Sequence, residues 1–224
     1  MEGMQMGAYL VYKSAGVFLD QADIAKNKID YSGVTGTLIP GDMKFEDVNG
    51  DGKIDADDRV RLDKSITPNF NYGATAEIRY KGFDLSILFQ GASGADIRVQ
   101  TESGDIGNFL KYSYDNRWSI DKPSAEHPRL ASRGDTYFTG GNFGNNTYYL
   151  FSKNYLRLKN LELGYNLPKN ILNKIRISNL RIFVNGLNLF TIDKTTVYDP
   201  EATVQSGVYY PQARVINSGL TLTF

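Results

Sequence analysis

Apolar and polar residues alternate with a period of two along several stretches of the chain, which is the pattern of half-buried β-strands. The clearest case covers residues 72–92, where two alternating stretches meet at Lys81-Gly82. The apolar positions are Ala74, Ala76, Ile78 and Tyr80 in the first stretch, and Phe83, Leu85, Ile87 and Phe89 in the second. Leu88 interrupts the polar side. This pattern predicts a β-hairpin with one apolar and one polar face.

Three further strands are predicted at residues 155–167, 179–192 and 213–224. In the first of these the apolar parity changes after Leu158, and a β-bulge near Lys159-Asn160 accounts for the change. Residues 7–18 are a weaker sixth candidate. The sequence therefore predicts an all-β protein of about six antiparallel strands.

The connections between these strands alternate between short and long. The short ones are Lys81-Gly82 and residues 167–178, whereas the long ones cover about 19–71, 93–154 and 193–212. Outer-membrane barrels have this arrangement, with short periplasmic turns and long extracellular loops, and their strands need only about 9–11 residues to cross the bilayer. The pattern favours transmembrane barrel strands, although the chain has no long apolar helix and begins without the layout of a signal peptide.

An acidic segment, DVNGDGKIDADD at residues 47–58, has the spacing of an EF-hand calcium loop inside the predicted extracellular loop 19–71. Gly52 occupies the position of the sharp turn, and Ile54 is the one large apolar side chain that can attach the loop to neighbouring structure. The predicted ligands are Asp47, Asn49, Asp51, the Lys53 carbonyl, Asp55 and Asp58.

Two alternatives to a calcium site remain open for this segment. Asp58 stands where EF-hands usually carry a bidentate Glu, so the affinity is open, and a solvated acidic turn is the simpler interpretation. A catalytic carboxylate pair is a poorer one, because a tuned pKa needs burial and this segment is very polar. A structural Ca²⁺ ion is the favoured prediction.

Composition excludes several other functions. The 25 Lys and Arg residues balance 25 Asp and Glu residues, so no overall field attracts nucleic acid. The chain contains no cysteine, and its one histidine, His127, precedes a proline, as expected for a loop residue. No Ser-His-Asp set, nucleophile elbow or phosphate-binding glycine loop is present, so we expect no enzymatic activity.

Several motifs together resemble the C-terminal part of SusC/RagA-type TonB-linked outer-membrane transporters. They occur in that family's order, and they are GDMKFEDVNGDGKIDADDRV, TPNFNYGATAEIRYKGFDLSILFQG, NRWSID, PRL, YLRLKNLELGYNLP, LRIFVNGLNLFT, YDPE and the terminal phenylalanine. The resemblance covers nearly all of residues 1–224. It implies a fragment of a larger barrel, of about 22 strands, in the cell outer membrane.

The resemblance also implies partners and a transport function. Such transporters import oligosaccharides or peptides together with a SusD-like surface lipoprotein, and they contact the TonB complex through an N-terminal part that this chain lacks. Leu220, Leu222 and Phe224 resemble the C-terminal signal that the barrel-assembly machinery reads. With about six strands in outer-membrane lipid, the fragment alone is not expected to transport anything. Glu77, Arg79, Asp84 and Gln90 are predicted to face the lumen.

Two rival interpretations have a different function class. One is a secreted β-rich module that binds calcium or glycans, with Trp118, Tyr137 and Phe138 as a platform for sugars, although loop packing or an interfacial belt explains such aromatics more simply. The other is a dockerin-like calcium module. Pro68 and the strand pattern that follows the acidic segment argue against it, and a second calcium loop is missing.

Overall fold

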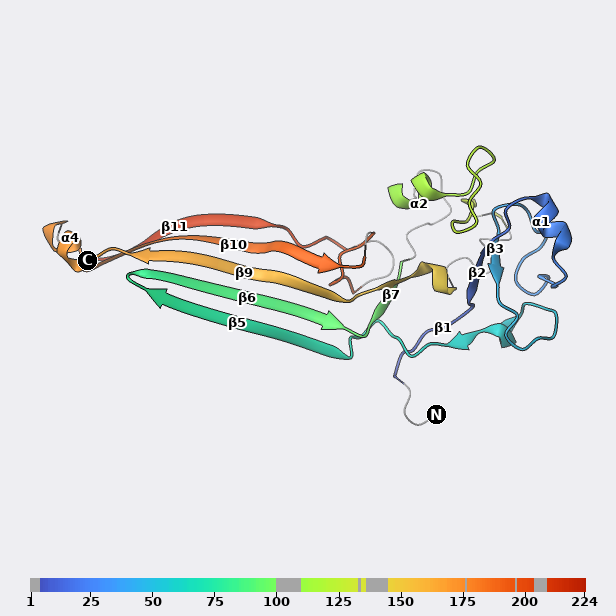
Figure 1. Cartoon of the computed structure of the whole chain (residues 1–224), viewed down its shortest axis with the longest axis horizontal. Helices are drawn as coiled ribbons and strands as arrows, with labels where there is room; N and C mark the ends of the chain where they lie inside the picture. Colours follow the sequence, from blue (N-terminus) through green and yellow to red (C-terminus); the bar gives the residue numbers. More distant parts are fainter. Residues whose placement is uncertain are drawn as a thin grey trace. The chain divides into compact units, whose positions relative to one another are not determined.

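The computed structural model describes residues 5–99, 110–132, 134–135, 145–175, 177–195, 197–203 and 209–224. These residues form two compact units, and each unit is assembled from separate segments of the chain (Figure 1). The first unit comprises Met1–Ile66, Asp96–Phe151 and Ala202–Tyr209, and the second comprises Thr67–Ala95, Ser152–Glu201 and Tyr210–Phe224.

The second unit is an antiparallel sheet of five long strands in the order β5-β6-β9-β10-β11 (Figure 1). The strands are β5 (Phe70–Tyr80), β6 (Phe83–Ser93), β9 (Tyr155–Asn166), β10 (Asn179–Asp193) and β11 (Val215–Thr223). Each strand pairs with the one before it in this series, and β5 and β11 are the edges. The predicted hairpin and the three further strands are thus confirmed, and the described residues form an open sheet, not a closed barrel.

Local geometry explains the short connections and the change of parity. Lys81 and Gly82 both have positive φ, 49° and 88°, as a two-residue type I′ hairpin turn requires. The other short connection contains α4 (Lys169–Leu172) and the 3₁₀ turn η3 (Asn173–Ile175). On β9 the register passes from Leu158 to Asn160 against one step on β6, which leaves Lys159 as the extra residue and confirms the predicted bulge.

All the long connections join the same end of this sheet. Phe70 pairs with Ser93, and Tyr155 pairs with both Ala92 and Asp193, so the start of β5 and β9 and the end of β6 and β10 lie together. The two short connections join the opposite end. The predicted alternation of short and long connections is therefore present in the sheet.

The first unit has many short elements around an aromatic core. Its elements are β1 (Leu10–Val11), β2 (Ser14–Val17), α1 (Gln21–Lys26), β3 (Met43–Phe45), η1 (Ala56–Asp58), β4 (Val60–Arg61), β7 (Asp96–Arg98), α2 (Lys111–Asn116), η2 (Thr147–Tyr149) and β8 (Leu150–Ser152). The sheets are β1-β4, β2-β3 and β7-β8. The core residues are Tyr12, Phe18, Tyr31, Val34, Met43, Phe45, Ile54, Ala131 and Tyr149. Much of the predicted loop 19–71 is therefore folded structure. In the described part of the chain, no helix has the length and apolar character needed to cross a membrane.

Residues 7–18 contain strand structure, as predicted, but they do not form a sixth strand of the long sheet. This segment forms β1 and β2, which pair with β4 and β3 inside the first unit. Gly16 has φ of +100°, and a β-carbon there would lie 2.8 Å from the Ala125 carbonyl oxygen. Gly16 lies inside β2, and its left-handed backbone coincides with the shift in the register of β2 with β3.

Candidate functional site

One face of the five-stranded sheet is apolar and exposed. Cross-strand pairing aligns its side chains in rows, for example Ile78 with Leu85 and Leu163, and Ile182 with Leu220. Large fractions of these side chains are accessible, including 51% of Leu163, 50% of Val184 and 62% of Leu220. A water-soluble protein rarely leaves so large a contiguous apolar face uncovered.

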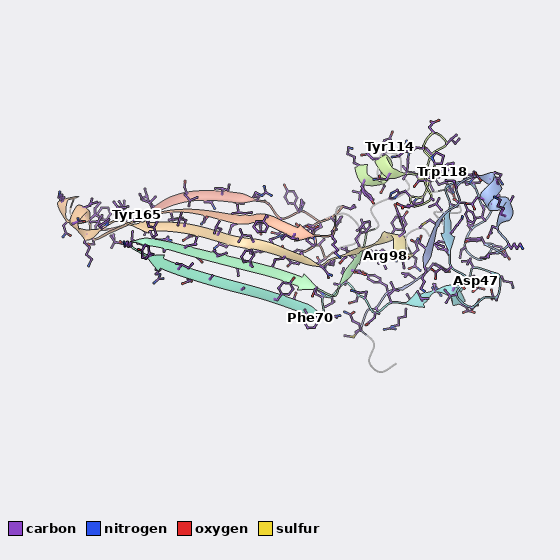
Figure 2. All side chains as sticks on the ribbon, in the orientation of Figure 1. Asp47, Phe70, Arg98, Tyr114, Trp118 and Tyr165 are labelled. Carbon is purple, nitrogen blue, oxygen red and sulfur yellow. The ribbon has the colours of Figure 1, made fainter. Side chains whose placement is uncertain are left out.

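Aromatic residues mark both ends of this apolar face. Tyr165 lies at the end with the short connections, and Phe70 lies at the other end (Figure 2). The rings of Phe83 and Tyr165 are 4.5 Å apart, and Tyr80 pairs with Phe83 across the hairpin. At the other end lie Phe70 and Tyr72, and the Tyr72 hydroxyl donates to the Tyr155 carbonyl at 3.0 Å. With a rise of about 3.4 Å per residue, Tyr72 and Tyr80 are about 27 Å apart along β5. Transmembrane barrels have an apolar band of about 25 Å between two aromatic girdles.

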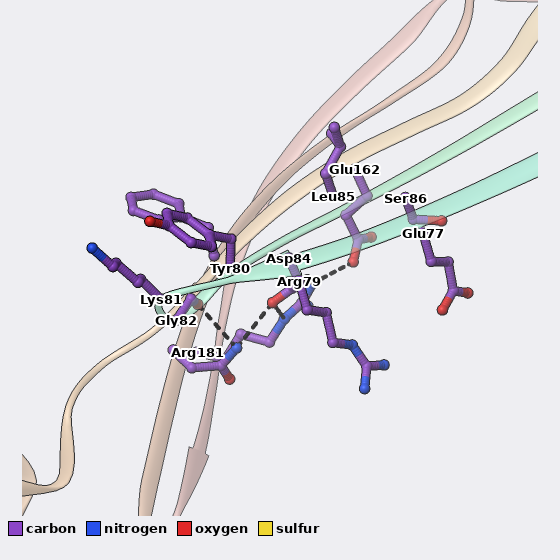
Figure 3. A pocket seen from close by; sticks show the side chains of 12 residues that line it. Glu77, Arg79, Tyr80, Lys81, Gly82, Asp84, Leu85, Ser86, Glu162 and Arg181 are labelled. Carbon is purple, nitrogen blue, oxygen red and sulfur yellow. Dashed lines mark hydrogen bonds and ion pairs between the residues drawn. The ribbon is translucent and has the colours of Figure 1, made fainter.

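The opposite face carries a row of ion pairs over three strands (Figure 3). Arg181 of β10 lies between Asp84 of β6 and Glu162 of β9, with its Nη2 2.7 Å from Glu162 Oε1 and its Nε 3.2 Å from Asp84 Oδ1. Asn166 also donates to Asp84, at 2.9 Å. These residues line a polar hollow of about 720 Å³. The predicted lumen-facing residues Glu77, Arg79, Asp84 and Gln90 all have the parity of this face.

A glycine makes room for this ion-pair network. A β-carbon on Gly164 would lie 2.5 Å from Asp84 Oδ2 and 2.7 Å from Arg181 Cζ. The guanidinium therefore crosses β9 directly over Gly164. Farther along the row, the Arg181 guanidinium is 5.2 Å from the centre of the Phe183 ring, and this ring covers Gly219. Because Gly164 and Gly219 have no side chain, large neighbouring side chains can pack directly on their backbone. The sequence pattern did not single out either glycine.

A second and more buried ion cluster lies on the polar face near the long connections. Arg157 of β9 contacts Asp199 at 3.1 Å and Glu201, and its Nε donates to the Thr191 hydroxyl at 2.8 Å. Lys159 contacts Glu201 at 3.1 Å. Burial raises the pKa of Asp199, but the amides of Gln212 and Glu201 and the charge of Arg157 outweigh it, so the pKa lies below the ordinary value. The YDPE motif, residues 198–201, was singled out in the sequence, but nothing in that motif indicates that Arg157 is its partner.

The acidic segment 47–58 folds as a tight loop in the first unit. Asp47 accepts the amides of Gly50 at 2.7 Å and Gly52 at 2.9 Å, and Gly52 has φ of +80°. Ile54 is fully buried in the core, which confirms that it attaches the loop to neighbouring structure. Asp58 is also fully buried, and its carboxylate accepts the amides of Val48 at 2.8 Å and Asp55 at 2.9 Å.

This geometry meets the calcium prediction only in part. The sharp turn at Gly52 and the buried Ile54 suit a calcium loop, whereas the carboxylates of Asp47 and Asp58 accept backbone amides. Within the residues described, no group of three or more His, Cys, Asp or Glu side chains is arranged to hold a metal ion. Calcium binding by Asp47, Asn49, Asp51, Lys53, Asp55 and Asp58 stays a prediction.

The remaining predicted residues lie in different settings. Leu220 and Leu222 are on the apolar face, and Phe224, 88% exposed, follows the end of β11. Trp118 donates its indole N–H to the Leu19 carbonyl at 3.0 Å and packs over Gly41, so loop packing accounts for it. His127 is a loop residue, as predicted, and its Nδ1 is 2.8 Å from the Tyr148 hydroxyl. Tyr137 and Phe138 fall outside the described residues.

Comparison with known sequences finds relatives among the TonB-dependent receptors. TonB-dependent receptor P3 of Formosa agariphila is 29% identical over 238 aligned positions, which cover 100% of this chain and 22% of the receptor. TonB-dependent receptor P26 of the same organism is 30% identical over 216 positions, covering 89% of this chain and 21% of the receptor. No family model matches the chain.

Solved structures of the RagAB transporter are similar to this chain as well. The RagAB peptide transporter superimposes with a TM-score of 0.68 at 25% identity, covering 97% of this chain and 23% of the transporter chain. The RagAB peptide importer in its open-open state gives 0.65 at the same identity and coverage of 97% and 22%. The chain is a distant homologue of part of a TonB-dependent receptor. The chain spans about a fifth of the length of the relatives that it matches.

Proposed function

We propose that the chain supplies consecutive wall strands and external loops of a SusC/RagA-type TonB-dependent transporter in the outer membrane. The exposed apolar face, bounded by aromatic residues at both ends, is the observation that carries this proposal. In lipid each Leu, Ile, Val or Phe on that face is stabilised by burial, whereas in water the same side chains favour aggregation. The polar face then lines the lumen.

The edges of the sheet support the same proposal. β5 and β11 are edge strands among the described residues, and their outer backbone groups need hydrogen-bonding partners in lipid. Neighbouring strands of a larger barrel would satisfy them. In this arrangement the short connections are periplasmic turns, and the long connections, which include the predicted loop 19–71, are extracellular.

The transported substrate and the partners follow from the family. RagAB is described as a peptide importer, so a peptide is the better supported substrate, and an oligosaccharide is the alternative. The partners would be a SusD-like lipoprotein at the surface, the TonB complex at the periplasmic side, and the barrel-assembly machinery, which would read Leu220, Leu222 and Phe224. Glu77, Arg79, Asp84 and Gln90 would contact solute in the lumen, and the chain would have no catalytic role.

Calcium is part of the proposal as a structural ion of the extracellular unit. Oxygen donors at alternate residues of the 47–58 loop are suited to Ca²⁺, and weak extracellular calcium sites are occupied at millimolar concentrations. A bound ion would hold together a loop whose carboxylates otherwise accept backbone amides.

Sedimentation of the purified chain tests the membrane proposal. In detergent micelles we expect a defined species with β-structure, and after detergent removal we expect aggregation, because the apolar face has no other covering. A monodisperse monomer that unfolds cooperatively in detergent-free buffer would reject the barrel wall and favour the secreted module.

A further inference from the structure

The connection between β10 and β11 turns back onto the polar face of the sheet. Its YDPE segment, residues 198–201, meets Arg157 on β9, more than forty residues earlier in the chain. Asp199 joins the two halves of the connection as well, because it accepts the amides of Glu201 at 2.9 Å and Gln212 at 3.0 Å. One carboxylate therefore binds the strand and closes the loop.

Charge and burial both stabilise the contact between residues 198–201 and β9. Arg157, Lys159, Asp199 and Glu201, here called the clasp, contain two positive and two negative charges. The side chains of Arg157, Asp199 and Glu201 are only 3%, 8% and 17% exposed. The guanidinium also faces the Tyr155 ring, 5.6 Å from its centre. Removing one partner leaves buried charge without compensation, which is far costlier than losing an exposed ion pair.

The bulge in β9 positions Lys159 for its contact with Glu201. Lys159 is the extra residue of the bulge, and its Nζ reaches Glu201 on the polar face together with Arg157. Beside the clasp lies a hollow of about 430 Å³, which includes Asn188, Thr191, Tyr198 and Gln212 in its lining. The folded-back segment thus occupies the polar face at the level of Gln90, which pairs with Arg157.

We propose that the clasp fixes residues 198–201 as a constriction of the passage along the polar face. This inference rests on the proposed function, because only a closed barrel makes the polar face a passage. A solute that moves along this part of the wall, from the end with the long connections toward Ser86, would meet residues 198–201 at the level of Gln90.

Hydrogen exchange of the full-length polypeptide that carries this chain, in detergent micelles, tests the clasp itself. In Arg157→Met we expect the amides of Glu201 and Gln212 to exchange on the order of a hundredfold faster, because breaking a buried ion pair shifts local opening by at least this factor. Asp199→Asn, which keeps the size of the side chain, is a milder second variant with the same direction. Asp193→Asn is the matched control, since this carboxylate accepts the Thr195 amide and not Arg157. Unchanged exchange in both clasp variants would overturn the clasp whether or not the chain is in a membrane.

Labelling by reagents of two sizes tests the constriction. Residues 1–224 contain no cysteine, so Ser86→Cys introduces a single thiol on the polar face once any cysteine elsewhere in the polypeptide is replaced by serine. In lipid vesicles that expose the extracellular side, we expect a small maleimide to label this thiol in every variant. A maleimide with a bulky polymer chain should label it only when Arg157→Met or Asp199→Asn is also present. Equal labelling by the bulky reagent with an intact clasp would overturn the constriction, while the exchange result would still report on the clasp.

Discussion

At the scale of single residues, Gly164 decides whether the Asp84–Arg181–Glu162 network can form. We expect Gly164→Ala to push the guanidinium off β9 and to destabilise the sheet by about 1–3 kcal/mol, the usual cost of overpacking. Gly73→Ala on β5 is the control, because the β-carbon there meets only the Phe89 carbonyl oxygen, at 3.2 Å. Unfolding by denaturant in detergent micelles measures both, and equal stabilities for the two variants would contradict this role of Gly164.

Asp23 gives a pH-dependent prediction at the same scale. Its pKa lies below the ordinary value, first because Lys44 donates to it at 2.7 Å and then because the Leu19 amide does. A carboxyl with a lowered pKa in the folded state adds stability above its unfolded pKa of about 3.9 and loses it as the pH falls through the folded pKa. We expect Lys44→Met to raise the pKa of Asp23, with Lys26→Met as the weaker control. NMR titration of the Asp23 carboxyl carbon is the measurement, and an unchanged midpoint in Lys44→Met would refute the assignment.

At the scale of elements, the two faces of β10 predict opposite responses to a charge. Val184 on the apolar face is 50% exposed in the isolated sheet, so water alone would tolerate Lys there. In lipid, Val184→Lys should cost about 2–4 kcal/mol near the bilayer centre. Asn185 lies on the polar face and donates to Glu162, so Asn185→Lys should change the stability by less than about 1 kcal/mol. Folding into lipid vesicles at graded urea concentrations compares them, and similar costs would argue against a lipid-facing surface.

The acidic loop 47–58 is tested for calcium binding as an element of the first unit. Asp47→Ala with Asp51→Ala removes two of the four predicted ligand carboxylates, and with them half of the ligand charge that offsets dehydration of the ion, so calcium affinity should be lost. Asp57→Ala is the control, since Asp57 is not a predicted ligand. Isothermal titration with magnesium as competitor measures the affinity. Absence of calcium-specific heat up to about 10 mM would return residues 47–58 to a solvated turn.

The same elements show what the sequence could predict. Residues 72–92 and the later strands obey a period of two, because one face of each strand is apolar, so their extent and even the bulge at Lys159 were predictable. Residues 7–18 also alternate, but the positive φ of Gly16 and pairing with distant β3 and β4 decide their fold. Arg157 and the YDPE segment are far apart in sequence, so no local pattern could pair them.

At the scale of the whole molecule, the central claim is that the sheet is a wall with lipid on one side and water on the other. The long connections at one end and short turns at the other, the aromatic residues at both ends of the apolar face, and the homology to TonB-dependent receptors all agree with it. A water-soluble sheet with the same strands would instead need a protein layer over the apolar face.

A cysteine scan of β6 in the full-length polypeptide, reconstituted in lipid vesicles, tests this claim most directly. Residues 1–224 contain no cysteine, and any cysteine elsewhere in the polypeptide is first replaced by serine. Each residue from Phe83 to Gln90 is replaced in turn and labelled with a fluorescent probe. We predict that quenchers attached to lipid chains act at Phe83, Leu85, Ile87 and Phe89, and that a water-soluble quencher acts at Asp84, Ser86, Leu88 and Gln90. Quenching from water at every position, or without a period of two, would contradict the account.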